Sequence, residues 1–143
     1  MTDQQISDLG PIDYLIVEWP GRQPDGSALP KLLELVDAGL IRILDLAFIA
    51  KTEDGTVARL ELNELGAAFE VFDGASSDLL DDGDLAEAAS AIEPGTSAAV
   101  LIWENVWAAP FAAALRANGA QLVATGRIPL QAIAESLESA AAA

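Results

Sequence analysis

The sequence contains no cysteine and no histidine among its 143 residues. Without cysteine the chain has no disulfide, no thiolate nucleophile and no Cys-based metal site. Without histidine it has neither imidazole acid–base catalysis nor imidazole ligation. Because these absences remove much of the usual catalytic repertoire, we favour a function other than catalysis, and we expect no cofactor and no bound metal.

Basic residues are also scarce. Seven lysines and arginines oppose 23 acids, which gives a net charge of −16, and eleven acids with no basic residue separate Arg59 from Arg116. A field of this sign repels phosphate backbones and anionic lipid surfaces. We therefore expect no nucleic-acid partner and no membrane partner.

Long apolar runs are missing as well. The run from Leu40 to Ala50 is interrupted by Arg42 and Asp45 and is too short to cross a bilayer. The segment from Met1 to Gly10 is polar and acidic, without the basic and apolar regions of a secretory signal. These features predict a cytoplasmic protein.

The length fits one domain over residues 1–143, and an apolar content of 52% is sufficient for a core. We expect the core to span residues 10–138. Residues 63–83 are acidic and contain three glycines, which predicts a mobile insert. The alanine-rich end, residues 139–143, predicts a fraying tail.

Apolar patterning and turn residues predict alternating strands and helices. The expected strands are residues 12–19, 40–50, 57–62, 97–104 and 120–126. The expected helices are residues 30–38, 85–92, 109–118 and 130–139, with Asp84 as the N-cap of the second. Glu53, Asp54 and Gly55 predict a hairpin turn between the second and third strands.

A weak internal repeat relates the two halves of this pattern. Pro30 and Pro110 each begin a helix, and Gly39 and Gly119 each end one at the same offset. Two βαβ halves, an extra hairpin strand, an acidic insert and a C-terminal helix predict an α+β ferredoxin-like sandwich. In this arrangement we expect strands 12–19 and 97–104 to be parallel neighbours, with the helices on one face and the other face bare.

Four segments also carry a family resemblance: GPIDYLIVEWPG (10–21), DAGLIRILDLAFIAKTEDG (37–55), AIEPGTSAAVLIWENVWAAPF (91–111) and GRIP (126–129). From Gly10 to about Leu137 the chain resembles a bacterial family of small acidic proteins known as a domain of unknown function. More distantly, the segment order is similar to a second uncharacterised family, in which a Gly-rich, membrane-associated stretch replaces residues 63–83. The resemblance implies the fold and brings no activity with it.

The C-terminal ends of two parallel neighbouring strands would meet at one edge of the sheet. This edge predicts a site for a small ligand or a partner, because it combines aromatic and polar groups. The candidates are Glu18, Trp19, Arg22, Trp103, Glu104, Asn105, Trp107 and Arg127. Arg22 or Arg127 would be the ion-pair partner of Glu104, and packing of the tryptophans in the core is the alternative interpretation.

Other motifs are weaker. The acidic stretch 78–84 lacks the spacing of a calcium loop, and no glycine-rich phosphate loop is present. Three functional hypotheses remain. The first is a non-enzymatic regulatory or interaction module that forms a homodimer or higher homo-oligomer through a bare sheet face. The second is a binding protein for a small neutral or cationic metabolite, and the third is a metal-free enzyme that uses Glu18 or Glu104.

Overall fold

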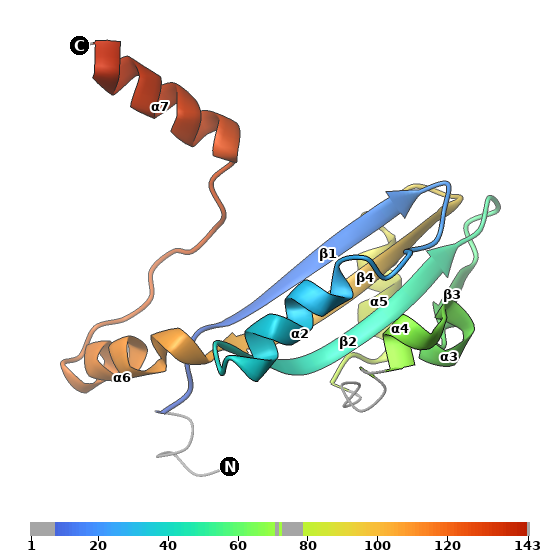
Figure 1. The fold of residues 1–143 in the computed structure, drawn as a ribbon, viewed down its shortest axis with the longest axis horizontal. Coiled ribbons are helices and arrows are strands. Elements are labelled where there is room, and N and C mark those ends of the chain that lie inside the picture. Colours follow the sequence, from blue (N-terminus) through green and yellow to red (C-terminus); the bar gives the residue numbers. More distant parts are fainter. Residues whose placement is uncertain (1–7, 71, 73–78, 143) are drawn as a thin grey trace.

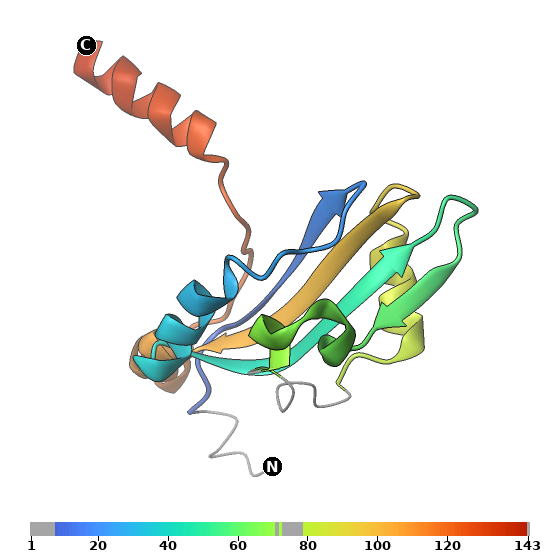
Figure 2. The ribbon, with the colours of Figure 1, turned by 45° about the vertical axis from the view of Figure 1, so that its right-hand side comes forward.

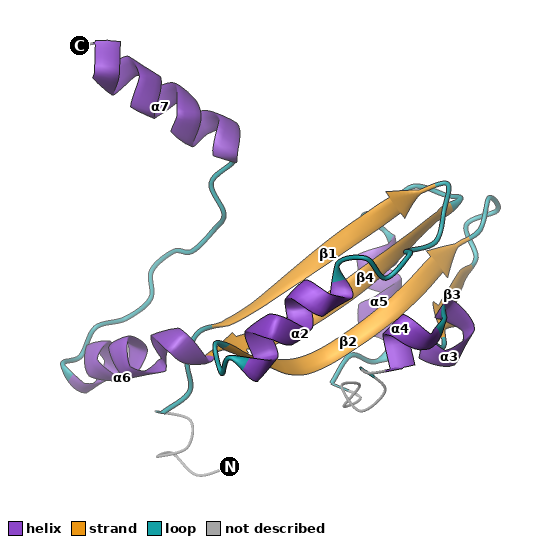
Figure 3. Cartoon of the chain, viewed as in Figure 1, coloured by secondary structure: helices purple, strands orange, loops and turns teal. Residues whose placement is uncertain are grey.

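The computed structural model describes residues 8–70, 72 and 79–142. Its centre is a four-stranded antiparallel sheet (Figures 1 and 3). The strands are β1 (Ile12–Pro20), β2 (Ile41–Lys51), β3 (Val57–Leu60) and β4 (Thr96–Asn105), and their order in the sheet is β1-β4-β2-β3. The predicted α+β class is confirmed.

The helices are α2 (Leu29–Asp37), α3 (Leu62–Leu65), α4 (Ala67–Glu70), α5 (Asp82–Ala89), α6 (Ala109–Ala117) and α7 (Leu130–Ala142). As the repeat predicted, α2 and α6 each have proline in the first turn. Gly39 and Gly119 follow these two helices with φ of 73° and 86°. Glycine reaches this left-handed region without steric cost, which explains why both helices end there.

The predicted direction of β1 and β4 is wrong. The two strands are neighbours, but they pair antiparallel, with Ile12 opposite Glu104 and Trp19 opposite Ser97. The β4 strand also pairs antiparallel with β2. β1 and β2 therefore run in the same direction, joined through α2, and β4 lies between them and runs opposite to both.

Helices cover both faces of the sheet, so the prediction of one face bare of helices is also wrong (Figures 1 and 2). On the first face, α2, α3 and α4 pack against Phe48, Leu101 and their neighbours. On the opposite face, α5 packs against Ile49 and Val100. Below, the two surfaces are called the α2 face and the α5 face.

The second face is covered because part of the acidic segment folds. Asp81, not Asp84, is the N-cap of α5. Its side chain accepts a hydrogen bond from the Asp84 backbone N–H, and the Asp84 side chain accepts one from the Asp81 N–H. This capping box satisfies two backbone donors at the helix start.

The segment expected to be a mobile insert also contributes to the core. Helices α3 and α4 form within it, and Phe69 and Phe72 are buried against the α2 face. The ring of Phe69 meets that of Phe48 edge to face at 5.2 Å between centroids. Residues 71 and 73–78 of the predicted insert lie outside the described residues.

The C-terminal part of the chain departs furthest from the prediction. Residues 120–126 form no strand, and α7 stands away from the sheet at the end of an extended connection (Figures 1 and 2). The expected tail belongs to α7, which continues to Ala142. None of the helices among the described residues has the length and apolar character needed to span a membrane.

Candidate functional site

The structure does not bring the eight predicted site residues together. Glu18, Trp19 and Arg22 lie at or beyond the C-terminal end of β1, whereas Glu104 lies opposite the first residue of β1. Ile12, the β1 residue opposite Glu104, is six residues from Glu18, so at about 3.3 Å per residue the two glutamates are about 20 Å apart along the sheet. The predicted edge therefore divides into two separate ends of the sheet, because β1 and β4 are antiparallel.

Glu104 is a buried carboxylate, with 5% of its surface exposed. Its Oε1 accepts a hydrogen bond from Arg42 Nε at 2.9 Å and forms an ion pair with Arg42 Nη2, also at 2.9 Å, and its Oε2 accepts a hydrogen bond from the Gly10 N–H at 2.8 Å. Arg42 is the residue opposite Glu104 on β2. The prediction that Arg22 or Arg127 pairs with Glu104 is wrong, because Arg42 on β2 supplies the cation.

Gly10 is required where the chain enters the sheet. A Cβ added there would lie 2.1 Å from the Asn105 carbonyl oxygen, closer than any non-bonded contact allows. The absence of a side chain lets the Gly10 N–H reach Glu104. Pro11 continues the contact, because its carbonyl accepts a hydrogen bond from the Asn105 N–H at 2.8 Å.

Asn105 joins two tryptophans to β1. Its Oδ1 accepts hydrogen bonds from the indole N–H of Trp103 at 3.1 Å and of Trp107 at 3.3 Å. Its Nδ2 donates to Asp13 Oδ2 at 2.8 Å and to the Pro11 carbonyl at 3.2 Å. Since Glu104 and Asn105 are satisfied within the chain, these bonds give both residues a structural role.

The other predicted residues lie in different surroundings. Trp103 is buried in the core of the α2 face, while most of the Trp107 surface is exposed. Trp19 is half-buried on the same face, and Glu18 and Arg22 are exposed. Arg127 is exposed in the connection between α6 and α7.

Asp45 is a buried carboxylate that the sequence analysis treated only as an interruption of an apolar run. It is fully buried beside a bulge in β2, where the register with β4 shifts. Its two oxygens accept hydrogen bonds from the backbone N–H of Leu46 at 2.8 Å and of Leu80 at 2.7 Å. The sequence feature that could have revealed Asp45 is its apolar surroundings, since it is a single acid in a strand whose next four residues are all apolar. Asp45 thus holds the segment that precedes α5 against β2.

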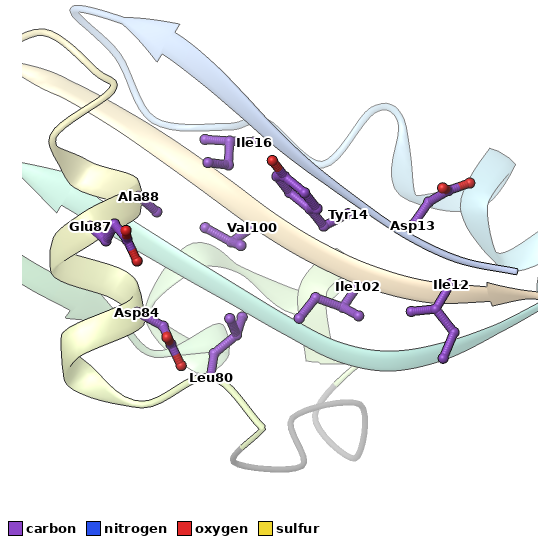
Figure 4. A pocket seen from close by; sticks show the side chains of 10 residues that line it. All are labelled: Ile12, Asp13, Tyr14, Ile16, Leu80, Asp84, Glu87, Ala88, Val100 and Ile102. Atoms are coloured by element: carbon purple, nitrogen blue, oxygen red, sulfur yellow. The ribbon is translucent and has the colours of Figure 1, made fainter. Parts of the chain in front are cut away.

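A groove of about 510 Å³ lies on the α5 face, between β1 and α5 (Figure 4). Helix α5 packs against both β2 and β4 on this face, and β1 lies beside it with two of its side chains exposed. Tyr14 is 73% exposed and Ile12 is 49% exposed. The floor and wall of this groove, called the β1–α5 groove below, consist of Ile12, Asp13, Tyr14, Ile16, Leu80, Asp84, Glu87, Ala88, Val100 and Ile102.

A second pocket, of about 240 Å³, lies on the α2 face beside Trp19. Its lining is mainly apolar, with Val17, Phe48 and Leu101 from the sheet and Leu32 from α2. Asp25 and Ser27 contribute polar atoms from the loop before α2. The lining suits an apolar group better than a cation.

Two carboxylates have a lowered pKa: Asp54, in the turn between β2 and β3, and Asp25, in the loop that lines the pocket beside Trp19. A hydrogen bond from the Thr52 hydroxyl, supported by one from the Thr56 N–H, lowers the pKa of Asp54 from 3.8 to about 2. A hydrogen bond from the Ser27 N–H lowers the pKa of Asp25. Both carboxylates stabilise turns. Among the described residues, no cluster of three acidic side chains is arranged to hold a metal ion.

Residues 8–143 match the family of unknown function DUF6325, and the chain belongs to that family. No curated protein and no solved structure matches the chain. The family membership agrees with the resemblance to a domain of unknown function and assigns no activity.

Proposed function

We propose that this protein is a non-enzymatic, self-associating interaction module that uses the β1–α5 groove as its contact surface. The observation that carries the proposal is the apolar side of this groove, where Ile12 and Tyr14 are exposed beside Ile16 and Ile102. Covering apolar surface stabilises a complex by about 25 cal/mol for each Å² removed from water. Exposed apolar patches of this kind are typical of protein contact surfaces.

The buried carboxylates support a module without catalytic activity. Glu104 is held by Arg42 and the Gly10 N–H, and Asp45 is held by two backbone N–H groups. Neither carboxylate lines the groove or the pocket beside Trp19. Glu18, the other carboxylate of the enzyme hypothesis, is exposed and about 20 Å away along β1, so the two cannot act as an acid–base pair.

The acids beside the groove favour an acid-free segment of a second copy over a nucleic acid or an anionic membrane as the occupant. The α5 side of the groove carries Asp84 and Glu87, whereas the Asp13 side chain points to the other side of β1 (Figure 4). The occupant must therefore present an apolar surface with few acids. The chain contains such a segment, because residues 105–134 include no acid and two arginines. The lack of cysteine supports our assignment of the protein to the cytoplasm.

Sedimentation velocity over a range of concentrations tests the proposal. We expect the wild-type chain to form a dimer or a higher homo-oligomer. Tyr14→Glu places a charge in the groove and should shift the chain to a monomer. Val57→Glu adds the same charge on β3, at the opposite edge of the sheet, and should leave the oligomer intact. A wild-type chain that stays monomeric at all concentrations contradicts the proposal.

Small-molecule binding is a second candidate, favoured by the apolar pocket beside Trp19. A saturable rise in melting temperature with one member of a metabolite library would support it. The rise should disappear in Leu101→Ala, which alters the pocket, and persist in Tyr14→Glu, which alters the groove. If no compound gives a saturable shift that depends on Leu101, this candidate fails.

A further inference from the structure

The C-terminal arm, residues 118–142, carries apolar side chains that nothing in the described chain covers. Leu122 is 82% exposed and Val123 is 95% exposed. Residues 121–128 form no backbone hydrogen bond with the rest of the described chain. Leu130, Ile133 and Leu137 follow on α7 at a spacing that places them along one side of the helix. The arm thus has the side chains of a strand followed by an amphipathic helix, without a surface to pack on.

The outer edge of β1 is the matching unpaired element. β1 is the first strand in the sheet order, and no strand among the described residues pairs with its outer edge. An open strand edge presents unpaired N–H and C=O groups to any extended segment. The apolar residues Tyr14 and Val17 of β1 are exposed beside this edge.

The topology indicates where the arm would pair. The connection β1-α2-β2 places two parallel strands on either side of β4. The same right-handed connection, starting from β4 through α6, places residues 120–126 beyond β1, parallel to β4 and antiparallel to β1. The internal repeat between the two halves, with its matching Pro and Gly positions, supports this equivalence.

The arm of the same chain starts at the wrong end of β1 for this pairing. Helix α6 is held at the Ile12 end, where Arg116 donates a hydrogen bond to the Leu9 carbonyl at 2.7 Å and the Trp107 N–H donates one to the Leu40 carbonyl. Antiparallel pairing begins at the Trp19 end, about 25 Å further along β1. The β1 strand of a second copy has no such restriction, and α7 points away from its own sheet (Figure 1).

We infer that the C-terminal arm of one copy docks on a second copy, with residues 120–126 paired antiparallel to the β1 edge and α7 in the β1–α5 groove. This inference rests on the self-association proposed above and names the segment that produces it. An antiparallel strand over 120–126 ends beside Ile12, where the groove begins. Only Arg127, Ile128 and Pro129 separate this strand from α7, so the helix follows directly onto Ile12 and Tyr14 (Figure 4).

Charge and length agree with this placement. Arg127 is the one charged residue between α6 and Glu135. In the docked arm it lies at the Ile12 end of a groove whose α5 side carries Asp84 and Glu87. Glu135 and Glu138 of α7 fall on a different side of the helix from Leu130, Ile133 and Leu137.

The thirteen residues of α7 are about 20 Å long. This length exceeds the distance from Ile12 to Ile16 and covers the exposed part of the groove.

Site-directed crosslinking tests the inference, since the chain has no cysteine and any introduced cysteine is unique. Val123→Cys lies in the arm and Val17→Cys lies in β1. Both side chains are exposed, so neither substitution should disturb the fold. The two single variants are mixed, treated with a short bis-maleimide and analysed on a denaturing gel. Val57→Cys on β3, mixed with Val123→Cys, is the matched control.

We expect the Val123→Cys and Val17→Cys mixture to give a covalent dimer on the order of tenfold more abundant than the control, because docking raises the local concentration of the two thiols. A dimer by sedimentation without this excess overturns the docking and leaves the self-association standing. A strictly monomeric chain overturns both. A double variant that crosslinks only within one chain shows that the arm folds back on its own domain and overturns the exchange between copies.

Discussion

At the scale of single residues, the contacts of Glu104 determine how the N-terminal entry is held to the sheet. The carboxylate is buried and accepts hydrogen bonds from Arg42 and from the Gly10 N–H. We predict that Glu104→Gln lowers the free energy of unfolding by about 2 kcal/mol, because bonds to a charged group are lost or weakened. Urea unfolding at one fixed protein concentration measures the change.

Glu18→Gln is the matched control for this prediction. Glu18 lies on the neighbouring strand and is exposed, so the same substitution should change the unfolding free energy by less than about 0.5 kcal/mol. Equal effects of the two substitutions would show that Arg42 and Gly10 do not stabilise the fold through Glu104. Sequence alone could identify Glu104 as a special carboxylate, but it could not identify Arg42 as its partner, because that depends on strand order.

The turn between β2 and β3 has a pH-dependent contact. The Thr52 hydroxyl, and to a lesser degree the Thr56 N–H, lower the pKa of Asp54 from 3.8 to about 2. A carboxylate whose pKa is lower in the folded state contributes stability above its unfolded pKa, and this contribution is lost as the pH falls through the folded value. Asp54 therefore stabilises the turn fully above about pH 3.8 and loses that contribution between about pH 3.8 and about pH 2.

We predict that the stability difference between wild type and Asp54→Asn is largest above pH 3.8 and narrows as the pH falls toward 2. Melting temperatures of both proteins across this range measure the difference and cancel the titration of the other acids. Thr52→Val removes the main hydrogen bond to Asp54. In a Thr52→Val background, the loss of stability caused by Asp54→Asn should therefore also be smaller. A difference that stays constant over the whole range would contradict the assignment.

At the scale of the elements, Lys51 connects the sheet to α5. Its Nζ donates hydrogen bonds to the Ala89 carbonyl at 3.0 Å and to the Ile92 carbonyl at 3.2 Å, just at the end of the helix. A cation there satisfies unpaired carbonyls and interacts favourably with the helix dipole. We predict that Lys51→Met destabilises the fold by about 1–2 kcal/mol. Amide hydrogen exchange should show the largest loss of protection in α5.

Lys31→Met provides the control for Lys51. Lys31 is exposed on α2, and its only described ion pair is with Glu34 at 3.6 Å. Exposed pairs of this kind contribute little, so the change should be about 0.5 kcal/mol or less. Loss of protection in α5 from the Lys31 variant, or none from the Lys51 variant, would contradict the proposed contact.

The positions of most elements could be predicted from the sequence, because periodicity and turn residues are local. The hairpin at Asp54-Gly55 and the helices between Pro30 and Gly39 and between Pro110 and Gly119 are confirmed. The N-cap of α5 was predicted three residues too late, because Asp81 and Asp84 are both good caps and only the reciprocal bonds distinguish them.

The sheet order and the predicted ligand site could not be obtained in the same way. A repeat shows that β1 and β4 are equivalent, but it does not give their relative direction, and the whole predicted edge depended on that direction. Residues 120–126 have strand-like composition but no neighbouring strand among the described residues. A strand is stabilised by its neighbours more than by its own propensity, which explains why this predicted strand is absent.

At the scale of the whole molecule, a net charge of −16 opposes the contact of two identical chains. The groove itself adds to this repulsion, since Asp84 and Glu87 stand on its α5 side. The apolar part of the interface must exceed this cost for the chain to self-associate. Arg127 offsets only a small part of it, because an exposed ion pair contributes about 0–1 kcal/mol.

Salt should therefore strengthen the association. The distance over which charges interact falls from about 30 Å at 0.01 M ionic strength to about 3 Å at 1 M, so added salt screens the repulsion while leaving apolar contacts in place. We predict that the dissociation constant, measured by sedimentation equilibrium, falls as sodium chloride is raised. Asp84→Asn combined with Glu87→Gln removes two charges from the rim and should tighten the association at low salt, with a weaker dependence on salt. The opposite trend, weaker association at high salt, would mean that ion pairs rather than the apolar groove hold the copies together.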